Sequence, residues 1–164
     1  MWTILLVEFD DEKNVDIVEP AVRARFGLVT KNLKVGMPRT RMRGWQSSAD
    51  DLLSEVCRLR IEHQTDYVLG LTKEDIYVPD MNFVFGLASS DGGCAIVSTN
   101  RLKSNDPGTF KERLLKEIIH ELGHVFGLSH CPDRRCVMHF SNSLQDTDFK
   151  SSEMCSNCSA RLSL

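Results

Sequence analysis

The feature that most constrains this chain is the run from His120 to His130, which has the form H-E-x-x-H-x-x-G-x-x-H. Two histidines four residues apart lie on one face of a helix, so both imidazoles can reach one metal ion. Gly127 allows the helix to end and the chain to turn, which brings the last histidine round as a third ligand. Three imidazoles and one open coordination position are typical of a catalytic zinc site rather than a closed structural site.

Four residues of this motif carry the predicted chemistry. We predict that zinc is bound by His120, His124 and His130. Glu121 follows the first ligand and can reach a water molecule beside the metal, so we predict that it is the general base. The alternative is an amphipathic helix whose histidines are ordinary core residues, and it treats the whole spacing as a coincidence.

The residues around the motif predict a long helix. Thr109 and Glu112 form a T-x-x-E capping box at its start. Gly123 costs about 1 kcal/mol relative to Ala in a helix interior, which suggests a close approach of another backbone near the metal. Lys116 is expected to pair with Glu112, and orientation of a substrate carboxylate is the alternative role. Apolar residues recur at steps of three and four: Leu114, Leu115, Ile118, Ile119, Leu122, Val125 and Phe126.

Two close pairs of cysteines follow the histidine motif, and this layout is typical of a four-cysteine zinc site. We therefore predict two zinc ions per chain, one catalytic and one structural. Disulfides are the alternative, and they suit secreted proteins. The predicted ligands of the structural ion are Cys131, Cys136, Cys155 and Cys158. The two remaining cysteines are expected to be small buried residues rather than nucleophiles; they are Cys57 and Cys94.

Taken together, the histidine motif, the four cysteines and Met138 resemble the archaemetzincin family of the metzincin zinc metallopeptidases. The resemblance implies a zincin-like fold and peptidase activity. It also implies that Met138 belongs to a tight turn beneath the catalytic zinc, the Met-turn. Residue chemistry alone assigns Met138 only an apolar packing role.

The chain has 164 residues and a formal net charge of -3. This length predicts a single compact domain over residues 1–164. Residues 1–127 would hold the sheet and the helices, and residues 128–164 would form a C-terminal subdomain with the Met-turn and the four-cysteine site. The mild charge does not indicate nucleic-acid or membrane partners. Without a signal-peptide pattern or an apolar run of the ~18 residues that span a membrane, we expect a cytoplasmic monomer with reduced cysteines.

The rest of the chain predicts a mixed α/β architecture, with a twisted mixed sheet of about five strands and an antiparallel edge strand. One helix follows the apolar pattern of residues 15–26, although Pro20 could delay its regular part to Glu19. A second helix is predicted over residues 49–61, with Ser47 or Ser48 as its cap. The predicted strands are 4–9, 28–35, 67–71, 82–88 and 95–99.

Two further segments are of interest. Residues 82–88 are predicted to be an edge strand that pairs with an extended peptide substrate. The basic segment 37–45 is expected to be a mobile solvated loop, and a nucleic-acid-binding element is the alternative.

The function predicted from these features is zinc-dependent hydrolysis of a peptide or protein substrate, with aminopeptidase-like or endopeptidase-like action. Two alternatives remain open. One is a zinc-stabilised binding module whose catalytic site is vestigial. The other is an amidase that uses the same zinc chemistry on non-peptide substrates.

Overall fold

A five-stranded sheet forms the middle layer of the computed structural model, which describes residues 1–10 and 12–162. The strand order is β2-β1-β5-β8-β7, with parallel pairing between neighbours except for the antiparallel pair β7 and β8. The predicted mixed sheet with an antiparallel edge strand is therefore confirmed. The strands are β1 (Thr3–Glu8), β2 (Val29–Lys34), β5 (Tyr67–Thr72), β7 (Gly86–Ser89) and β8 (Cys94–Ser98).

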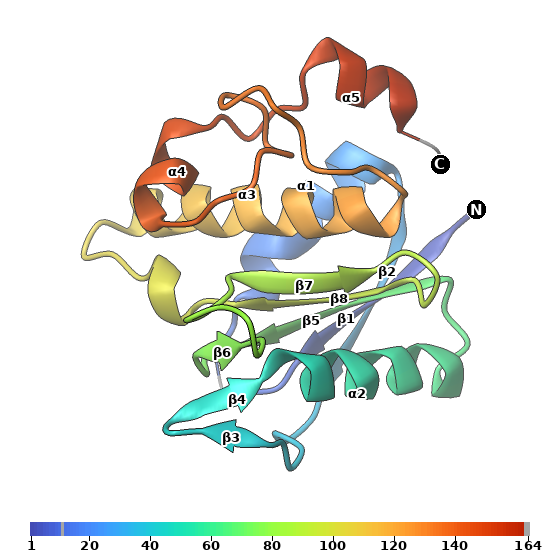
Figure 1. Ribbon diagram of the computed structural model, residues 1–164. Helices are drawn as coiled ribbons and strands as arrows, with labels where there is room; N and C mark the ends of the chain where they lie inside the picture. The colour runs from blue at the N-terminus through green and yellow to red at the C-terminus, as the bar shows by residue number, and fades with distance from the viewer. Residues whose placement is uncertain (11, 163–164) are drawn as a thin grey trace.

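Helices cover both faces of the sheet, as Figure 1 shows. Helices α1 (Val15–Phe26) and α3 (Pro107–Val125) lie on one face, and α2 (Ala49–Glu62) lies on the other. Strand β1 supplies side chains to both cores, because successive residues of a strand point to opposite faces. Ile4 and Leu6 belong to the core under α1 and α3, while the neighbouring odd-numbered residues belong to the core under α2.

The first residues of α2 and α1 test the predicted helix starts. Ser48 caps α2, because its side chain accepts a hydrogen bond from the backbone N–H of Asp51 at 3.2 Å. The delayed start of the first helix is wrong, since α1 already begins at Val15 and contains Pro20. Pro20 is exposed, so water can take the place of the backbone hydrogen bond that proline cannot donate.

A second, three-stranded sheet lies below the first in Figure 1 and was not predicted. It consists of β3 (Met42–Arg43), β4 (Gln46–Ser48) and β6 (Ile76–Tyr77). The expectation of a mobile solvated loop is therefore wrong for residues 42–45, which form a hairpin. Strands of two or three residues leave no periodic pattern to detect, and the β4–β6 pairing joins residues far apart in the chain.

The predicted edge strand 82–88 is confirmed in position but begins later than expected. Strand β7 starts at Gly86, and within residues 82–85 the structure describes one isolated bridge, which joins Val84 to Ile76. The carbonyl group of Asn82 is occupied by side chains of Arg43 and Gln46 instead of a neighbouring strand. Side-chain hydrogen bonds thus replace the ladder at the start of this segment.

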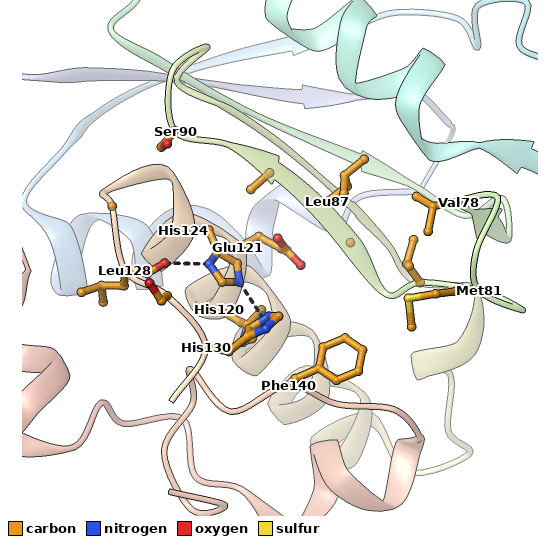
Figure 2. Close-up of a pocket in the computed structure, with 15 residues that line it drawn as sticks. Val78, Met81, Leu87, Ser90, His120, Glu121, His124, Leu128, His130 and Phe140 are labelled. Atoms are coloured by element: carbon orange, nitrogen blue, oxygen red, sulfur yellow. Dashed lines mark hydrogen bonds between the residues drawn. The ribbon is translucent and has the colours of Figure 1, made fainter. Parts of the chain in front are cut away.

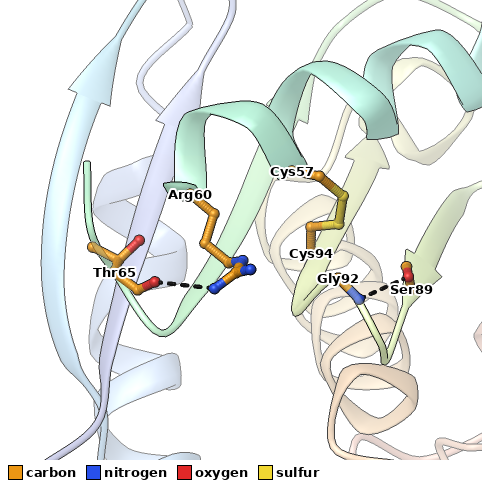
Figure 3. The surroundings of a disulfide bond; sticks show 6 residues. All are labelled: Cys57, Arg60, Thr65, Ser89, Gly92 and Cys94. Carbon is orange, nitrogen blue, oxygen red and sulfur yellow. Dashed lines mark hydrogen bonds between the residues drawn. A yellow bond between two sulfur atoms is a disulfide. The ribbon is translucent and has the colours of Figure 1, made fainter. Parts of the chain in front are cut away.

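Cys57 of α2 and Cys94 of β8 form a disulfide, with their Cα atoms 5.3 Å apart (Figure 3). The expectation that all cysteines are reduced is wrong for this pair. Cys94 is fully buried, as expected, and Cys57 is partly buried. The bond ties α2 to the turn between β7 and β8, where Gly92 lies against both sulfur atoms. A separation of 37 residues concealed this contact in the sequence.

The C-terminal part of the chain folds over α3 (Figure 1). It contains α4 (Leu144–Phe149) and α5 (Ser156–Arg161), and a short 3-10 helix, η1 (Asn100–Leu102), precedes α3. The buried Lys150 donates to the carbonyl oxygen of His139 at 3.0 Å and lies 3.4 Å from the Glu117 carboxylate. Residues 163–164 of the expected C-terminal subdomain lie outside the described residues. No helix in the described ranges is long and apolar enough to cross a membrane.

Candidate metal centre

Helix α3 carries the histidine motif, and its first turn differs from the prediction. Asp106 is the N-cap, because its carboxylate accepts a hydrogen bond from the backbone N–H of Thr109 at 3.3 Å. Pro107 occupies the first turn, where its missing N–H costs nothing. The predicted capping box at Thr109 and Glu112 is therefore wrong, and the N-cap lies three residues earlier than that box implies.

The first two histidines are oriented by backbone carbonyl groups. His120 Nδ1 lies 2.8 Å from the oxygen of Val137, and His124 Nδ1 lies 2.7 Å from the oxygen of Leu128. A hydrogen on each Nδ1 donates to that oxygen and leaves the Nε2 lone pair free for a metal. The two Nε2 atoms are 3.2 Å apart. Tetrahedral zinc, with Zn–N bonds of ~2.0–2.1 Å, holds two nitrogens ~3.3 Å apart. This separation fits a shared zinc ion.

The third histidine reaches the same point through a turn. Gly127 has φ 95°, in the left-handed region that favours glycine, and the N–H of Leu128 donates to the oxygen of Gly123 at 2.9 Å. The ring of His130 then lies 4.7 Å from that of His124, centroid to centroid. Figure 2 shows the three imidazoles together at the cleft. Their candidate ligand nitrogens lie within 4.8 Å of one another.

The surroundings favour neutral imidazoles, which is the form that binds metal. Burial lowers the pKa of His120 well below its usual value of 6.5, and the cation of Lys150 lowers it further. Burial likewise lowers the pKa of His124 and of His130. The three side chains are therefore ready to accept a cation near neutral pH.

Glu121 is buried at the wall of the cleft, with 6% of its surface exposed. Burial raises the pKa of its carboxyl group to about 8, and the neighbouring Glu117 adds to this rise, while Lys150 opposes it. A dication bound by the histidines would lower this pKa again, because it favours the carboxylate. The ionised form that a general base requires is therefore coupled to metal binding.

Met138 lies directly beneath the histidine helix, where the family resemblance places it. Its side chain is fully buried against Gly123, and a β-carbon added to Gly123 would collide with the Met138 sulfur. The glycine thus makes room for a side chain, and the expected close approach of another backbone is wrong. The oxygen of Met138 accepts a hydrogen bond from the N–H of Cys131 at 3.0 Å, which ties this turn to the cysteine cluster.

The four predicted cysteines converge on a second point. Their sulfur atoms lie within 4.8 Å of one another, and those of Cys131 and Cys155 are 3.7 Å apart. Tetrahedral zinc, with Zn–S bonds of ~2.3 Å, holds two sulfurs ~3.8 Å apart. The backbone N–H of Cys158 helps to lower the pKa of the Cys155 thiol to about 7. The donor set and its spacing fit a structural zinc ion.

A cleft of about 620 Å³ lies between β7 and the three histidines. Leu87 and Ala88 line it from the sheet, and Phe140 lines it from the segment that follows Met138. Lys116 is not part of it. Its ammonium group lies 3.5 Å from Glu112, as expected, and donates to the oxygen of Thr147 at 3.0 Å. Lys116 therefore docks α4, and the alternative role in orienting a substrate is not supported.

One site residue was missed in the sequence. Gly86 begins β7 and lies against the side chain of Glu121, so the strand that lines the cleft also packs on the predicted base. The available signal was a glycine inside an otherwise apolar strand, which often marks a close approach.

This chain is similar in sequence to several archaemetzincins. The archaemetzincin of Methanopyrus kandleri is 56% identical to this chain over 97 residues, which make up 59% of this chain and 55% of that protein. The archaemetzincin of Pyrococcus furiosus is 45% identical over 123 residues, or 71% of this chain and 64% of that protein. The chain thus spans a little over half the length of the first relative and somewhat under two thirds of the second.

Solved structures match nearly the whole chain. The crystal structure of the Methanopyrus kandleri archaemetzincin matches with a TM-score of 0.89 and 41% identity, covering 98% of this chain and 93% of that one. The archaemetzincin of Archaeoglobus fulgidus, complexed with malonate, matches with a TM-score of 0.86 and 32% identity, covering 97% and 99%. The zincin-like fold is therefore confirmed. Since the family model described as peptidase family M54 also matches residues 12–163, this chain belongs to peptidase family M54.

Proposed function

We propose that this protein is a zinc-dependent peptidase. The observation that carries the proposal is the convergence of three imidazoles beside Glu121 at the wall of an open cleft. Membership of peptidase family M54 supports it. His120, His124 and His130 would hold the ion, which, when bound, would acidify a water molecule and polarise the scissile carbonyl group.

The chain's own groups would handle the protons. The Glu121 carboxylate accepts a proton from the attacking water, whose oxygen adds to the carbonyl carbon of the substrate. The same carboxyl group then delivers the proton to the amide nitrogen as the C–N bond breaks. One carboxylic acid and one amine result, and Glu121 is returned to its ionised form. Its buried position keeps bulk water from competing for the proton.

An extended peptide would bind along β7. This strand pairs with β8 on one side only, so the backbone groups of its other edge face the cleft. A substrate strand can pair with that edge, which gives affinity for peptides of many sequences. The proximity of β7 to Glu121 supports this role, because it would place a bound backbone beside the predicted base.

The cysteine cluster would hold a second zinc ion with a structural role. Its four thiolates would complete a tetrahedral shell and leave no position for substrate. The cluster connects α5, through Cys155 and Cys158, to the turn that carries Met138. It would therefore fix the C-terminal segment on which Phe140 reaches the cleft.

The test is a peptide-library cleavage assay on zinc-loaded protein, with zinc content measured by elemental analysis. Glu121→Gln should keep two zinc ions per chain and lose activity by roughly 10²–10⁴-fold. His124→Ala should lose both the activity and the catalytic zinc ion. Glu112→Gln is a matched control, since this glutamate is exposed on the same helix.

The same assay separates the alternatives. A vestigial binding module would bind zinc and peptides without cleaving any of them. A non-peptide amidase would hydrolyse small amides and leave the peptide library intact, so a panel of small amides accompanies the library. Analysis of the products then distinguishes aminopeptidase from endopeptidase action, because only the former releases single N-terminal residues.

A further inference from the structure

The wall of the cleft opposite the zinc ligands is an irregular segment, residues 78–85, between β6 and β7. Val78, Met81 and Val84 line the cleft from this segment, and Figure 2 shows Val78 and Met81 across from the histidines. The segment contains one turn, in which the N–H of Met81 donates to the oxygen of Val78 at 3.1 Å. A wall without a strand or helix needs other contacts to keep its shape.

Arg43 of the β3–β4 hairpin supplies these contacts. Its guanidinium group donates to the oxygen of Met81 at 2.7 Å and to the oxygen of Asn82 at 2.9 Å. The same group lies over the Tyr77 ring, 4.2 Å from its centroid. Gln46 adds a hydrogen bond to the oxygen of Asn82 at 2.7 Å. The planar guanidinium thus holds two successive carbonyl groups and stacks on the strand that precedes them.

A buried carboxylate anchors the other end of this network. Asp75 is 1% exposed and accepts hydrogen bonds from Gln46 at 3.0 Å and from Arg101 at 2.8 and 2.9 Å. Arg101 also lies over the Phe83 ring, 4.0 Å from its centroid. Residues on both sides of Met81 are therefore fixed to the body of the protein, and its side chain has a defined place at the cleft.

Behind the cleft lies a smaller cavity of about 40 Å³. The cavity opens from the cleft, and the residues that border both spaces are Met81, Val84, Gly86, His120, Glu121 and Phe140. Phe83 and Glu117 line it further in. A space of this size holds a methyl or hydroxymethyl group but excludes a branched or aromatic side chain. Since His120 and Glu121 also border it, a side chain in this cavity would lie next to the reacting bond.

We propose that Met81 limits the substrate side chain beside the scissile bond to the size of alanine or serine, and that Arg43 is the positioning residue that holds Met81 in place. This proposal rests on the proposed peptidase function, because that function identifies the ligand as a peptide. It assigns to the basic hairpin a role in substrate selection, which its charge alone did not indicate.

The experiment uses two peptide hydroxamates that bind zinc and differ only in one side chain, alanine or leucine, at the residue beside the hydroxamate. Their Kd values are measured by calorimetry on the zinc-loaded protein, so the readout does not require turnover. The unmodified protein should bind the alanine compound about ten-fold or more tightly, since a misfit of a few methylene groups has at least this effect. Met81→Ala should reduce or reverse this ratio.

Three arginine variants test the positioning role. Arg43→Met should lower the ratio with unchanged zinc content and thermal midpoint. Arg43→Lys should also lower the ratio, because an ammonium group lacks the Nε–H that donates to Gln46 and the planar face that stacks on Tyr77. Arg39→Met is the matched control, since Arg39 is an exposed arginine of the same segment, and it should keep the original ratio.

Equal or tighter binding of the leucine compound by the unmodified protein would overturn the proposal. An unchanged ratio in Met81→Ala would overturn the role assigned to Met81. An unchanged ratio in Arg43→Met would overturn the positioning role assigned to Arg43. Failure of the proposed function looks different: a protein that shows the expected ratio but cleaves no peptide would contradict the peptidase activity and still support the selective cavity.

Discussion

Gly86 of β7 and Glu121 of α3 are in direct contact across the cleft wall. A β-carbon on Gly86 would lie 2.8 Å from Cγ and 3.0 Å from Oε1 of Glu121, and 2.7 Å from the backbone oxygen of Ile96. The oxygen of Ile96 belongs to the backbone of the neighbouring strand, so it cannot move without shifting that strand. Any side chain at residue 86 therefore displaces either the glutamate or the edge strand.

Gly86→Ala should accordingly retain zinc and lower kcat/KM for peptides by about 10²-fold, because a small displacement of a catalytic group has an effect of this order. The measurement is steady-state peptide hydrolysis together with zinc content. Gly36→Ala serves as the control, since a β-carbon there meets no atom within 4 Å. Full activity in Gly86→Ala would contradict the assigned role of Glu121.

Replacing one cysteine ligand should separate the two metal sites. Cys155→Ser should reduce the zinc content from two ions per chain to about one and destabilise the fold, because metal binding contributes to folding. Cys57→Ser breaks the disulfide instead and should keep both ions. Elemental analysis after purification without chelator gives the result, and identical zinc contents would argue against the structural site.

A chelator should remove the ions in a fixed order. The histidine site has an open coordination position and an exposed ligand in His130, so it should lose zinc first. The cysteine site should retain its ion until the protein unfolds. Zinc release followed with a colorimetric indicator during dialysis against chelator would show two phases, and release of both ions in one phase would contradict this order.

Glu8 should make stability depend on pH. It is 6% exposed, and its Oε1 accepts a hydrogen bond from the N–H of Asn14 at 2.7 Å. Burial raises the pKa of its carboxyl group from 4.5 to about 7. The folded protein therefore binds a proton that the unfolded chain releases, so this contribution is fully present below about pH 4.5 and is lost as the pH rises through 7.

Glu8→Gln removes that dependence. The variant should have a larger free energy of unfolding than the unmodified protein. The difference should rise from about 1 kcal/mol at pH 5 to about 3 kcal/mol at pH 8. Urea unfolding of both proteins at several pH values, with zinc present, measures the difference. Because both proteins lose zinc alike at low pH, the difference isolates Glu8, and a constant difference across this range would refute the proposed titration.

The histidine motif and the four cysteines could be located from the sequence because metal ligands follow fixed spacings within short segments. Long helices and buried strands could also be predicted, since their apolar periodicity is local. The start of α3 was harder to predict. Asp106 and Thr109 are both good capping residues, and the choice depends on Pro107 fitting the first turn.

The features that were missed depend on contacts between distant parts of the chain. Gln46 and Asn82 are 36 residues apart, yet their hydrogen bond joins the small sheet to the cleft wall. Cys57 and Cys94 form a disulfide that neither local context indicates. The hydrogen bonds to the carbonyl groups of Met81 and Asn82 likewise come from Arg43, which lies 38 and 39 residues earlier in the chain.

His130 and Cys131 are consecutive residues, yet they belong to two different sets of candidate ligands. One peptide bond therefore joins the two sets, and the position of either side chain restricts the other. An ion held by the cysteines would fix the backbone at Cys131 and thereby help to place His130. By thermodynamic linkage, the two ions would then raise each other's affinity by the same factor. Two centres that share no ligand would thus be coupled through the backbone, and loss of the structural ion would weaken the histidine site although no histidine is replaced.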